Sequence, residues 1–242
     1  MKKIVVFTGA GVSKESGIET FRDGSGSLWN NYSIEDVATP SGWRKNRELV
    51  LDFYNARRAE IALAKPNIAH ELIASLDQNY DVTVITQNVD DLHERAGSTN
   101  IIHLHGELTK ARGCMYLHKS SPLDNIVDIG YNDIKIGDKC EVTGSQLRPH
   151  IVWFGEDLDP NDLYYSTKAA SECDICIIIG TSMQVYPASE IPFLTPDDCK
   201  VFCVDPNDLG FYIPEFRKPF FHHIKEPATI GIQKVIEAIK GI

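Results

Sequence analysis

The chain has 242 residues, a mass of 27.0 kDa and a formal charge of −10, with a sequence pI near 5.2. Its 43% hydrophobic and 24% charged residues are typical of a folded globular protein, which excludes a disordered chain. The acidic balance argues against a nucleic-acid partner, because phosphate binding needs clustered Lys and Arg. No stretch approaches the roughly 20 apolar residues of a membrane span, and the apolar start is too short for a secretory signal. We expect a cytoplasmic protein with no membrane partner.

The first predicted element is a short buried strand over residues 3–7, which leads through a glycine turn into a helix that starts near Ser13. Similar apolar strands recur along the chain, each flanked by segments with helical periodicity, at residues 82–86, 175–179 and 201–204. Alternating strands and helices predict an α/β fold with a doubly wound, parallel, Rossmann-like sheet.

About 70 residues separate the first two predicted strands, far more than one crossover helix requires. Amphipathic helices are predicted there over residues 49–63 and, beyond Pro66, over residues 68–76. A second stretch with few apolar runs follows later in the chain. We therefore expect a small inserted domain of residues 31–76 and 109–145, and a larger domain of residues 1–30, 77–108 and 146–242.

Six cysteines are spread along the chain without the spacing of a disulfide framework. Cys173 and Cys176 form a CxxC pair, but Cys176 lies inside the apolar strand over residues 175–179. Free Cys is among the most often buried residues, so we expect core packing there rather than redox or metal chemistry.

The glycine turn after the first strand contains Gly9, Ala10 and Gly11. Glycines between a strand and a helix suit a nucleotide, because the backbone can approach a phosphate closely. The third glycine of GxGxxG is absent and no acidic residue ends a second strand some 20 residues later, so a dehydrogenase is poorly supported. A plain tight turn stays an alternative at this point.

The longer string GAGVSKESGIETFRD, residues 9–23, closely resembles the signature of the sirtuin family. Further motifs of that family follow in the same order: Gln87-Asn88-Val89-Asp90, His103-Leu104-His105-Gly106-Glu107, residues 148–156 and Gly180-Thr181-Ser182. Because these segments span most of the chain in register, the sequence is identified as similar to NAD-dependent protein-lysine deacylases. The resemblance makes the larger domain an NAD-binding domain, with NAD as co-substrate and acylated-lysine proteins as partners.

The resemblance implies cleavage of the nicotinamide–ribose bond and transfer of the acyl group to ADP-ribose, with free lysine, nicotinamide and 2′-O-acyl-ADP-ribose as products. It assigns His105 as the catalytic general base, a role that suits imidazole near neutral pH. Asn88, also catalytic, and Asp90 would hold the nicotinamide amide, and Gln87 the nicotinamide ribose. His103 is expected to be structural. The other NAD contacts implied are Gly9, Ala10, Gly11, Ser13, Gly180, Thr181 and Ser182, with Phe21 and Arg22 in a lid.

Substrate contacts are implied at two further places. Val152-Trp153-Phe154-Gly155 resembles the segment that pairs with an extended substrate peptide by strand addition. Tyr54 and Arg57 share a helix face at i and i+3, and they fall where class III sirtuins bind a succinyl or malonyl carboxylate. We therefore expect desuccinylase or demalonylase activity with deacetylase activity retained. A solvated basic face that includes Arg58 is the alternative.

Three positions depart from the family pattern. Most relatives hold a structural zinc with two CxxC pairs. Here Cys114 and Cys140 match the first cysteine of each pair, but Leu117 and Thr143 stand where the second cysteines are expected. His118 is one further candidate ligand. We expect a degenerate zinc-module-like segment without metal. Glu19 replaces a proline of the signature. The adenosine-ribose position reads Val204-Asp205-Pro206-Asn207, so Asp205 or Asn207 is the expected substitute.

Two alternatives remain open from sequence. One is a sirtuin-like ADP-ribosyltransferase or NAD hydrolase, against which the intact His105 and the Tyr54–Arg57 pair count. The other is a non-catalytic sensor of NAD or ADP-ribose, which would tolerate loss of Asn88, Asp90 or His105, although all are present. Nicotinamide release without deacylated peptide would favour the first, and NAD binding without turnover the second.

Overall fold

The computed structural model describes residues 1–19, 32–114, 125–208 and 210–240, which form a larger part around one sheet and a smaller part around another. The larger sheet has six strands, all parallel to their neighbours, in the order β3-β2-β1-β7-β8-β9. Their bounds are β1 Lys3–Thr8, β2 Asp81–Thr86, β3 Ile101–His103, β7 Ile175–Ile179, β8 Lys200–Val204 and β9 Phe221–Ile224. This confirms the doubly wound α/β fold.

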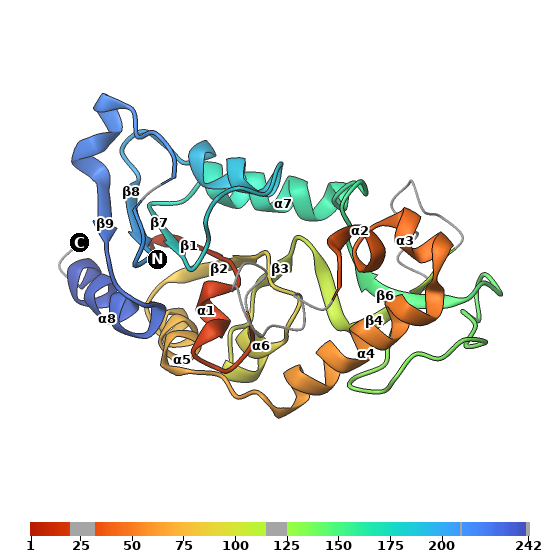
Figure 1. Cartoon of the computed structure of the whole chain (residues 1–242). Coiled ribbons are helices and arrows are strands. Elements are labelled where there is room, and N and C mark those ends of the chain that lie inside the picture. Colours follow the sequence, from red (N-terminus) through yellow and green to blue (C-terminus); the bar gives the residue numbers. More distant parts are fainter. Residues whose placement is uncertain (20–31, 115–124, 209, 241–242) are drawn as a thin grey trace.

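Both faces of this sheet are buried, as the continuous apolar runs require. Alternate residues of β1 face opposite ways, with Ile4 and Val6 in one core cluster and Val5 and Phe7 in another. The first cluster is covered by α5 (Ile68–Ser75) and α8 (Ala228–Ile239), and the second by α7 (Pro160–Ser171) and the 3-10 helix η4 (Ala188–Leu194). Figure 1 shows α7 above the sheet, and α5 and α8 below it.

The order in which successive strands are added to the sheet changes direction between β1 and β7. It runs from β1 through β2 to β3 on one side, and from β7 through β8 to β9 on the other. In open α/β sheets, ligands bind outside the carboxyl ends of the strands at such a switch point. The loops after β1 and β7 are therefore the first place to look for a nucleotide site.

The smaller part contains a three-stranded antiparallel sheet in the order β5-β4-β6 and a run of helices that packs against it. The strands are β4 Gly106–Gly113, β5 Ile126–Asp128 and β6 Leu147–Ile151, and the helices are α2 Ile34–Val37, α3 Pro40–Lys45 and α4 Arg47–Leu63. Ser33, Thr39 and Asn46 cap the three helices in turn, each accepting from a main-chain N–H of the first turn. These caps explain why the helical sequence breaks twice before the long α4.

The packing differs from the predicted division at three boundaries, those after residues 76, 108 and 145. Ala69 and Ile73 of α5 belong to the core of the six-stranded sheet, although residues 68–76 were expected in the small inserted domain. β4 begins at Gly106 and β6 ends at Ile151, so the small sheet extends past the boundaries expected at residues 108 and 146. We propose that the smaller part comprises residues 32–65 and 106–151, since α4 packs on β4 and β6 whereas α5 packs on the larger sheet.

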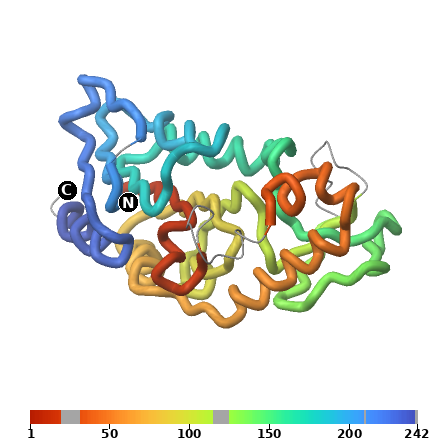
Figure 2. The backbone as a smooth tube through the Cα atoms, viewed as in Figure 1, coloured from red at the N-terminus to blue at the C-terminus, as the bar shows by residue number. Residues whose placement is uncertain are grey.

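The remaining described elements are α1 Gly11–Lys14, α6 Leu92–Ala96, and the 3-10 helices η2 Leu76–Gln78 and η5 Glu215–Phe220. The tube in Figure 2 shows the smaller part beside the larger one, with α4 extending from one toward the other. Among the described helices, none combines the length and apolar character that a membrane crossing requires. Cys173 and Cys176 are both buried in the larger core, as expected, and Cys173 Sγ lies 3.6 Å from Cys199 Sγ.

Candidate active site

The glycines of the first turn bring the loops after β1 and β7 into contact. The Gly11 N–H donates to Gly180 O at 2.8 Å, and a Cβ on Gly9 would lie 2.7 Å from Thr181 Cβ. Gly180 has φ +65°, and a Cβ there would lie 2.4 Å from Val12 N. Packing of one loop on the other therefore requires these glycines, and the two loops meet at the switch point, where open α/β sheets bind nucleotides.

A buried hydrogen-bond network holds Asn88 and Asp90 against Ser13, which follows the glycine loop. Ser13 Oγ donates to Asp90 Oδ2 at 3.0 Å and accepts from Asn88 Nδ2 at 3.1 Å. His70 Nε2 lies 3.4 Å from the same hydroxyl. Since His70 Nδ1 accepts from the Asn67 N–H, the proton of the neutral ring is on Nε2, and Ser13 is the acceptor. The Ser13 hydroxyl thus makes three hydrogen bonds.

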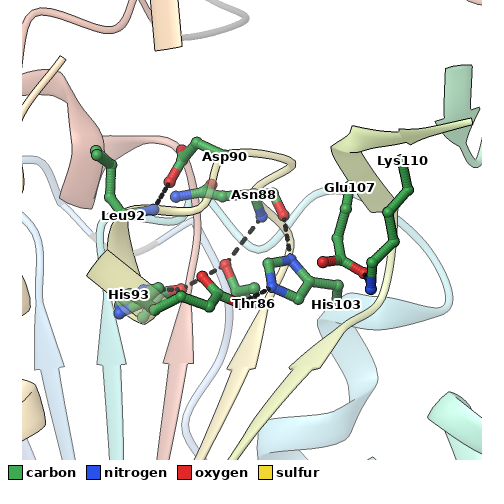
Figure 3. A network of polar contacts seen from close by, with 10 residues as sticks. Thr86, Asn88, Asp90, Leu92, His93, His103, Glu107 and Lys110 are labelled. Atoms are coloured by element: carbon green, nitrogen blue, oxygen red, sulfur yellow. Dashed lines mark hydrogen bonds and ion pairs between the residues drawn. The ribbon is translucent and has the colours of Figure 1, made fainter. Parts of the chain in front are cut away.

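The same network holds both carboxyl oxygens of Asp90. Its Oδ1 accepts from Leu92 N at 3.2 Å and its Oδ2 accepts from Ser13, so both oxygens act as acceptors, as in a carboxylate. Burial raises the pKa of Asp90, and the hydrogen bonds from Leu92 and Ser13 oppose that shift. Asn88 donates its amide nitrogen to Ser13, which leaves its Oδ1 as an acceptor. Figure 3 shows Asn88 beside Asp90.

A second layer of buried polar groups supports this network from below. Thr86 Oγ1 accepts from Asn88 N at 3.0 Å and from Thr8 Oγ1 at 2.8 Å. Because the Thr8 proton is used in that bond, Thr8 accepts from His93 Nε2, which lies 3.2 Å away. Burial lowers the pKa of His93 well below its usual value. The ends of β1 and β2 are thereby joined through side chains as well as through their ladder.

His105 lies just beyond β3 with its ring orientation determined by main-chain atoms. Its Nδ1 is 3.0 Å from Gln87 O, and because a carbonyl only accepts, Nδ1 carries the proton and Nε2 keeps the lone pair. Burial lowers the pKa of His105, and the Gln87 carbonyl opposes the shift in part. The ring therefore stays neutral near physiological pH. A Cβ on the following Gly106 would lie 2.0 Å from His150 O, so only glycine fits there.

The other predicted NAD contacts in the described residues lie after the carboxyl ends of β2, β7 and β8. Gln87 Nε2 donates to Thr181 Oγ1 at 3.1 Å, which connects the loops after β2 and β7. Ser182 is exposed beside Thr181. Asp205 follows β8, and its Oδ1 accepts from both Asn207 N and Asn207 Nδ2, so these two candidates form one turn. Phe21 and Arg22 lie outside the described residues.

The predicted peptide segment follows β6, which is an edge strand of the small sheet. The main-chain N–H groups of Val152, Trp153 and Phe154 already donate within the protein, to His105 O, Glu156 Oε2 and Ala38 O. Strand addition would therefore use carbonyl oxygens of this segment rather than those donors. The Trp153 side chain is buried against Trp43 and Tyr54, whereas Phe154 and Gly155 are exposed.

A buried ion network shapes this segment, and sequence reasoning missed it. Glu156 pairs with Arg148 at 2.5 Å and with Arg112 at 3.1 Å, and both guanidinium groups also donate to Ile151 O. The Arg148 guanidinium stacks 3.3 Å above the Trp153 ring. Two positive groups around one carboxylate and one carbonyl satisfy most of the polar atoms involved, and the loop after β6 takes its shape from them.

Tyr54 and Arg57 lie on the buried face of α4, so a solvated basic face is wrong for this helix. Arg58 is also buried, and it donates to Leu108 O and Asn55 Oδ1, which ties α4 to β4. Tyr54 accepts from Trp153 Nε1 at 3.0 Å, and burial raises the pKa of its phenol. Arg57 donates to Glu60 Oε2 at 3.0 Å and to Glu19 O at 3.4 Å, within the signature segment.

Cys114 and Cys140, which match the zinc-binding pattern of the family, both lie in the described residues. Cys140 is buried, Cys114 is partly buried, and Thr143 Oγ1 is bonded to Ser145 Oγ at 2.7 Å. A hydroxyl in such a bond is a poor substitute for a thiolate, so these donors do not fit a four-thiolate zinc site. Leu117 and His118 lie outside the described residues, and the absence of structural zinc stays a prediction.

Comparisons with known proteins agree with this geometry. The Sir2 family profile matches residues 9–187. The chain is 44% identical over 235 residues, 97% of each chain, to an NAD-dependent protein deacylase of Bacteroides thetaiotaomicron. It is 45% identical over 215 residues, 89% of each chain, to one of Helicobacter pylori.

Solved structures give the same result. A Sir2 homolog–NAD complex matches with a TM-score of 0.84 at 35% identity, covering 99% of this chain and 90% of that one. A Sir2 protein bound to acetylated peptide matches with a TM-score of 0.78 at 27% identity, covering 98% and 93%. The chain therefore belongs to the Sir2 family and is an NAD-dependent protein deacylase.

Proposed function

We propose that this enzyme removes acidic acyl groups such as succinyl and malonyl from lysine, while retaining activity on acetyl-lysine. The observation that carries the proposal is the burial of Tyr54 and Arg57 side by side on α4, with the guanidinium reaching the Glu19 carbonyl. A guanidinium binds a carboxylate through charge-assisted hydrogen bonds, which are stronger in a partly dry site than in water.

Arg57 already has one carboxylate partner, Glu60, and the acyl carboxylate would have to share the guanidinium with it. Burial raises the pKa of Glu60, with Arg57 opposing the shift. A guanidinium has five N–H donors, so it can serve two carboxylates at once. The Tyr54 hydroxyl accepts from Trp153 and keeps its own proton to donate to an acyl oxygen.

For NAD cleavage, we assign Asn88 and Asp90 to the nicotinamide amide. Asn88 Oδ1 offers an acceptor for the amide N–H, and the Ser13 network holds Asp90 in place. Gln87 is assigned to the nicotinamide ribose. These contacts would hold nicotinamide, the leaving group, away from the ribose while the acyl oxygen of the modified lysine approaches it. Binding both reactants in this geometry removes the entropy cost of bringing them together. The glycine loop, Ser13, Thr181, Ser182 and Asp205 are assigned to the rest of the dinucleotide.

His105 is assigned as the general base for a ribose hydroxyl. Its Nδ1–H is committed to Gln87 O, so the proton is accepted at Nε2, and no ring flip is needed. Because burial lowers the pKa of His105, the base stays active as the pH falls below the usual range of histidine. Val152, Phe154 and Gly155 are assigned to the substrate peptide, and Trp153 supports them from the core.

The test is mass spectrometry of matched succinyl-, malonyl- and acetyl-lysine peptides, incubated with and without NAD. We expect O-acyl-ADP-ribose from all three, with higher kcat/KM for the acidic groups. Arg57→Met should lower kcat/KM for succinyl-lysine roughly tenfold to a hundredfold, since a charge-assisted contact is worth about 1.5–3 kcal/mol, and should leave acetyl-lysine nearly unchanged.

The matched control is Arg44→Met, which removes an exposed guanidinium on α3 and should change neither activity. An equal loss on both peptides in Arg57→Met would contradict the acyl-pocket assignment. Nicotinamide release without any deacylated peptide would contradict the deacylase chemistry at this site.

A further inference from the structure

His103, two residues before His105, has hydrogen-bond partners at both ring nitrogens. Nδ1 lies 3.2 Å from Asn88 O, and Nε2 lies 2.6 Å from Glu94 Oε1. The His103 side chain is only 9% exposed, so water does not compete strongly for either contact. Figure 3 shows the ring directed at the Asn88 main chain, with Glu107 and Lys110 beyond it.

Counting protons gives the charge state of this residue. A peptide carbonyl only accepts hydrogen bonds, and an ionised carboxylate only accepts. A neutral imidazole has one N–H and could serve only one of the two oxygens. Both contacts are satisfied when one more proton is held between Nε2 and Glu94, which makes His103 an imidazolium paired with a carboxylate.

The surrounding charges favour that state. The ionisable groups that face His103 from neighbouring described elements are Glu94 and His93 of α6, Glu107 and Lys110 of β4, His150 of β6, Asp162 of α7, and Asp90. Burial lowers the pKa of His93 and of His150, so these two stay neutral, and carboxylates outnumber the one ammonium. Burial also opposes the charge of His103, but the Glu94 carboxylate outweighs it and raises the pKa.

A divalent cation is the competing occupant. Ligand atoms of Glu94, His103 and Glu107 lie within 4.8 Å of one another. The 2.6 Å between Nε2 and Glu94 is a hydrogen-bond distance, too short for two metal–ligand bonds of about 2 Å at ordinary angles. Lys110 Nζ lies 2.5 Å from Glu107 Oε2 and already neutralises it. The arrangement is that of a shared proton.

His103 connects this proton to the nicotinamide site. The Asn88 N–H donates to Thr86 Oγ1 and the side chain to Ser13, while the Asn88 carbonyl accepts from His103. When the extra proton leaves, the remaining N–H stays with the stronger acceptor, the Glu94 carboxylate. The Nδ1 lone pair then faces the Asn88 carbonyl oxygen, and an attraction becomes a repulsion.

We propose that His103 is a positioning residue, which as the imidazolium partner of Glu94 holds the Asn88 main chain in place and, on losing its proton, limits turnover at alkaline pH. The proposal rests on the proposed role of Asn88 in binding nicotinamide. His105 acts in the opposite direction, because it must be unprotonated to work. The pH profile is therefore bell-shaped, with an acid limb from His105 and an alkaline limb from the His103–Glu94 pair.

Glu94→Gln is the decisive variant. The side-chain amide that it introduces donates to the Nε2 of neutral His103, whose proton then stays on Nδ1 and on the Asn88 carbonyl at every pH. We expect the ratio of the nicotinamide-release rate at about pH 9 to that at about pH 7.5 to rise at least threefold over the wild type. Glu48→Gln, an exposed glutamate on α4, is the matched control and should reproduce the wild-type ratio.

Two further measurements separate positioning from folding. His103→Leu removes the contact at every pH, so kcat for nicotinamide release should fall about threefold to tenfold with no alkaline limb, and the KM for peptide should hold. Nitrogen-15 NMR of the full-length protein should find His103 titrating above the ordinary histidine range in the wild type, and lower in Glu94→Gln.

An unchanged alkaline limb in Glu94→Gln, with His103 titrating as expected by NMR, would overturn the positioning role and leave the deacylase assignment intact. Removal of the limb from the wild type by a metal chelator would also overturn it, in favour of a bound cation. Absence of nicotinamide release at every pH would overturn the proposed function itself, and this inference with it.

Discussion

The sheet edge that carries Asn88 and His105 and the face of α4 that carries Tyr54 and Arg57 orient their polar groups in different ways. At the sheet edge, main-chain carbonyls orient the two histidines: His105 donates to Gln87 O, and His103 to Asn88 O. On α4, side chains supply the shorter contacts: Trp153 donates to Tyr54 and Arg57 donates to Glu60, both at 3.0 Å, whereas the Glu19 carbonyl lies 3.4 Å from Arg57. The two histidines are therefore oriented by the fold, whereas the proposed acyl pocket depends mainly on exchangeable side chains.

The largest expected effect is at the sheet edge. His105→Ala should lower kcat for deacylation about 10²- to 10⁴-fold, because it removes the general base while the surrounding hydrogen bonds remain. Mass spectrometry of acyl peptide turnover measures this effect, and NAD binding should be retained. His222→Ala, at an exposed position on β9, is the control expected to match the wild type. A loss of kcat below tenfold would mean that another residue acts as the general base.

His70 tests how far the buried network stabilises the fold. Burial lowers the pKa of His70 to about 4 in the folded protein, below its ordinary value in the unfolded chain. As the pH falls, His70 is therefore protonated in the unfolded chain before it is protonated in the folded protein. The stability that neutral His70 contributes is full above about pH 6.5 and is lost as pH falls toward 4, an effect on the order of 3 kcal/mol. His70→Gln can keep both the Asn67 and Ser13 contacts without titrating.

Urea unfolding of wild type and His70→Gln across that pH range measures the effect. The two stability curves should diverge as pH falls, with the variant the less sensitive. His70→Ala, which loses both hydrogen bonds, should be the less stable protein at every pH. Parallel curves for wild type and His70→Gln would mean that His70 does not stay neutral in the folded state.

The smallest expected effect is on α4. Glu60→Gln removes the carboxylate that shares Arg57, so KM for a succinyl peptide should fall roughly twofold to fivefold, the usual range for a partly exposed pair. KM for the acetyl peptide should not change. Glu48→Gln on the same helix is the control. An equal change for both peptides would indicate an effect on α4 packing rather than on the acyl pocket.

Much of the larger sheet could be predicted, because its strands are apolar runs buried on both faces. β3 and β9, of three and four residues, were missed since so short a run has no distinct period. The layer on which α5 packs could not be predicted, because periodicity shows that a helix has an apolar face but not which layer that face meets. Ala69 and Ile73 meet the six-stranded sheet.

The sequence by itself determined the family, the fold class and the residues at the strand ends, because motif order and strand periodicity are local properties of the chain. Only the tertiary structure decided what those residues contact. The glycines of the first turn pack against Gly180, Trp153 turns inward, and His103, which the sequence marked as structural, shares a proton with Glu94. Such pairings join residues far apart in sequence, and burial rather than spacing sets their charge.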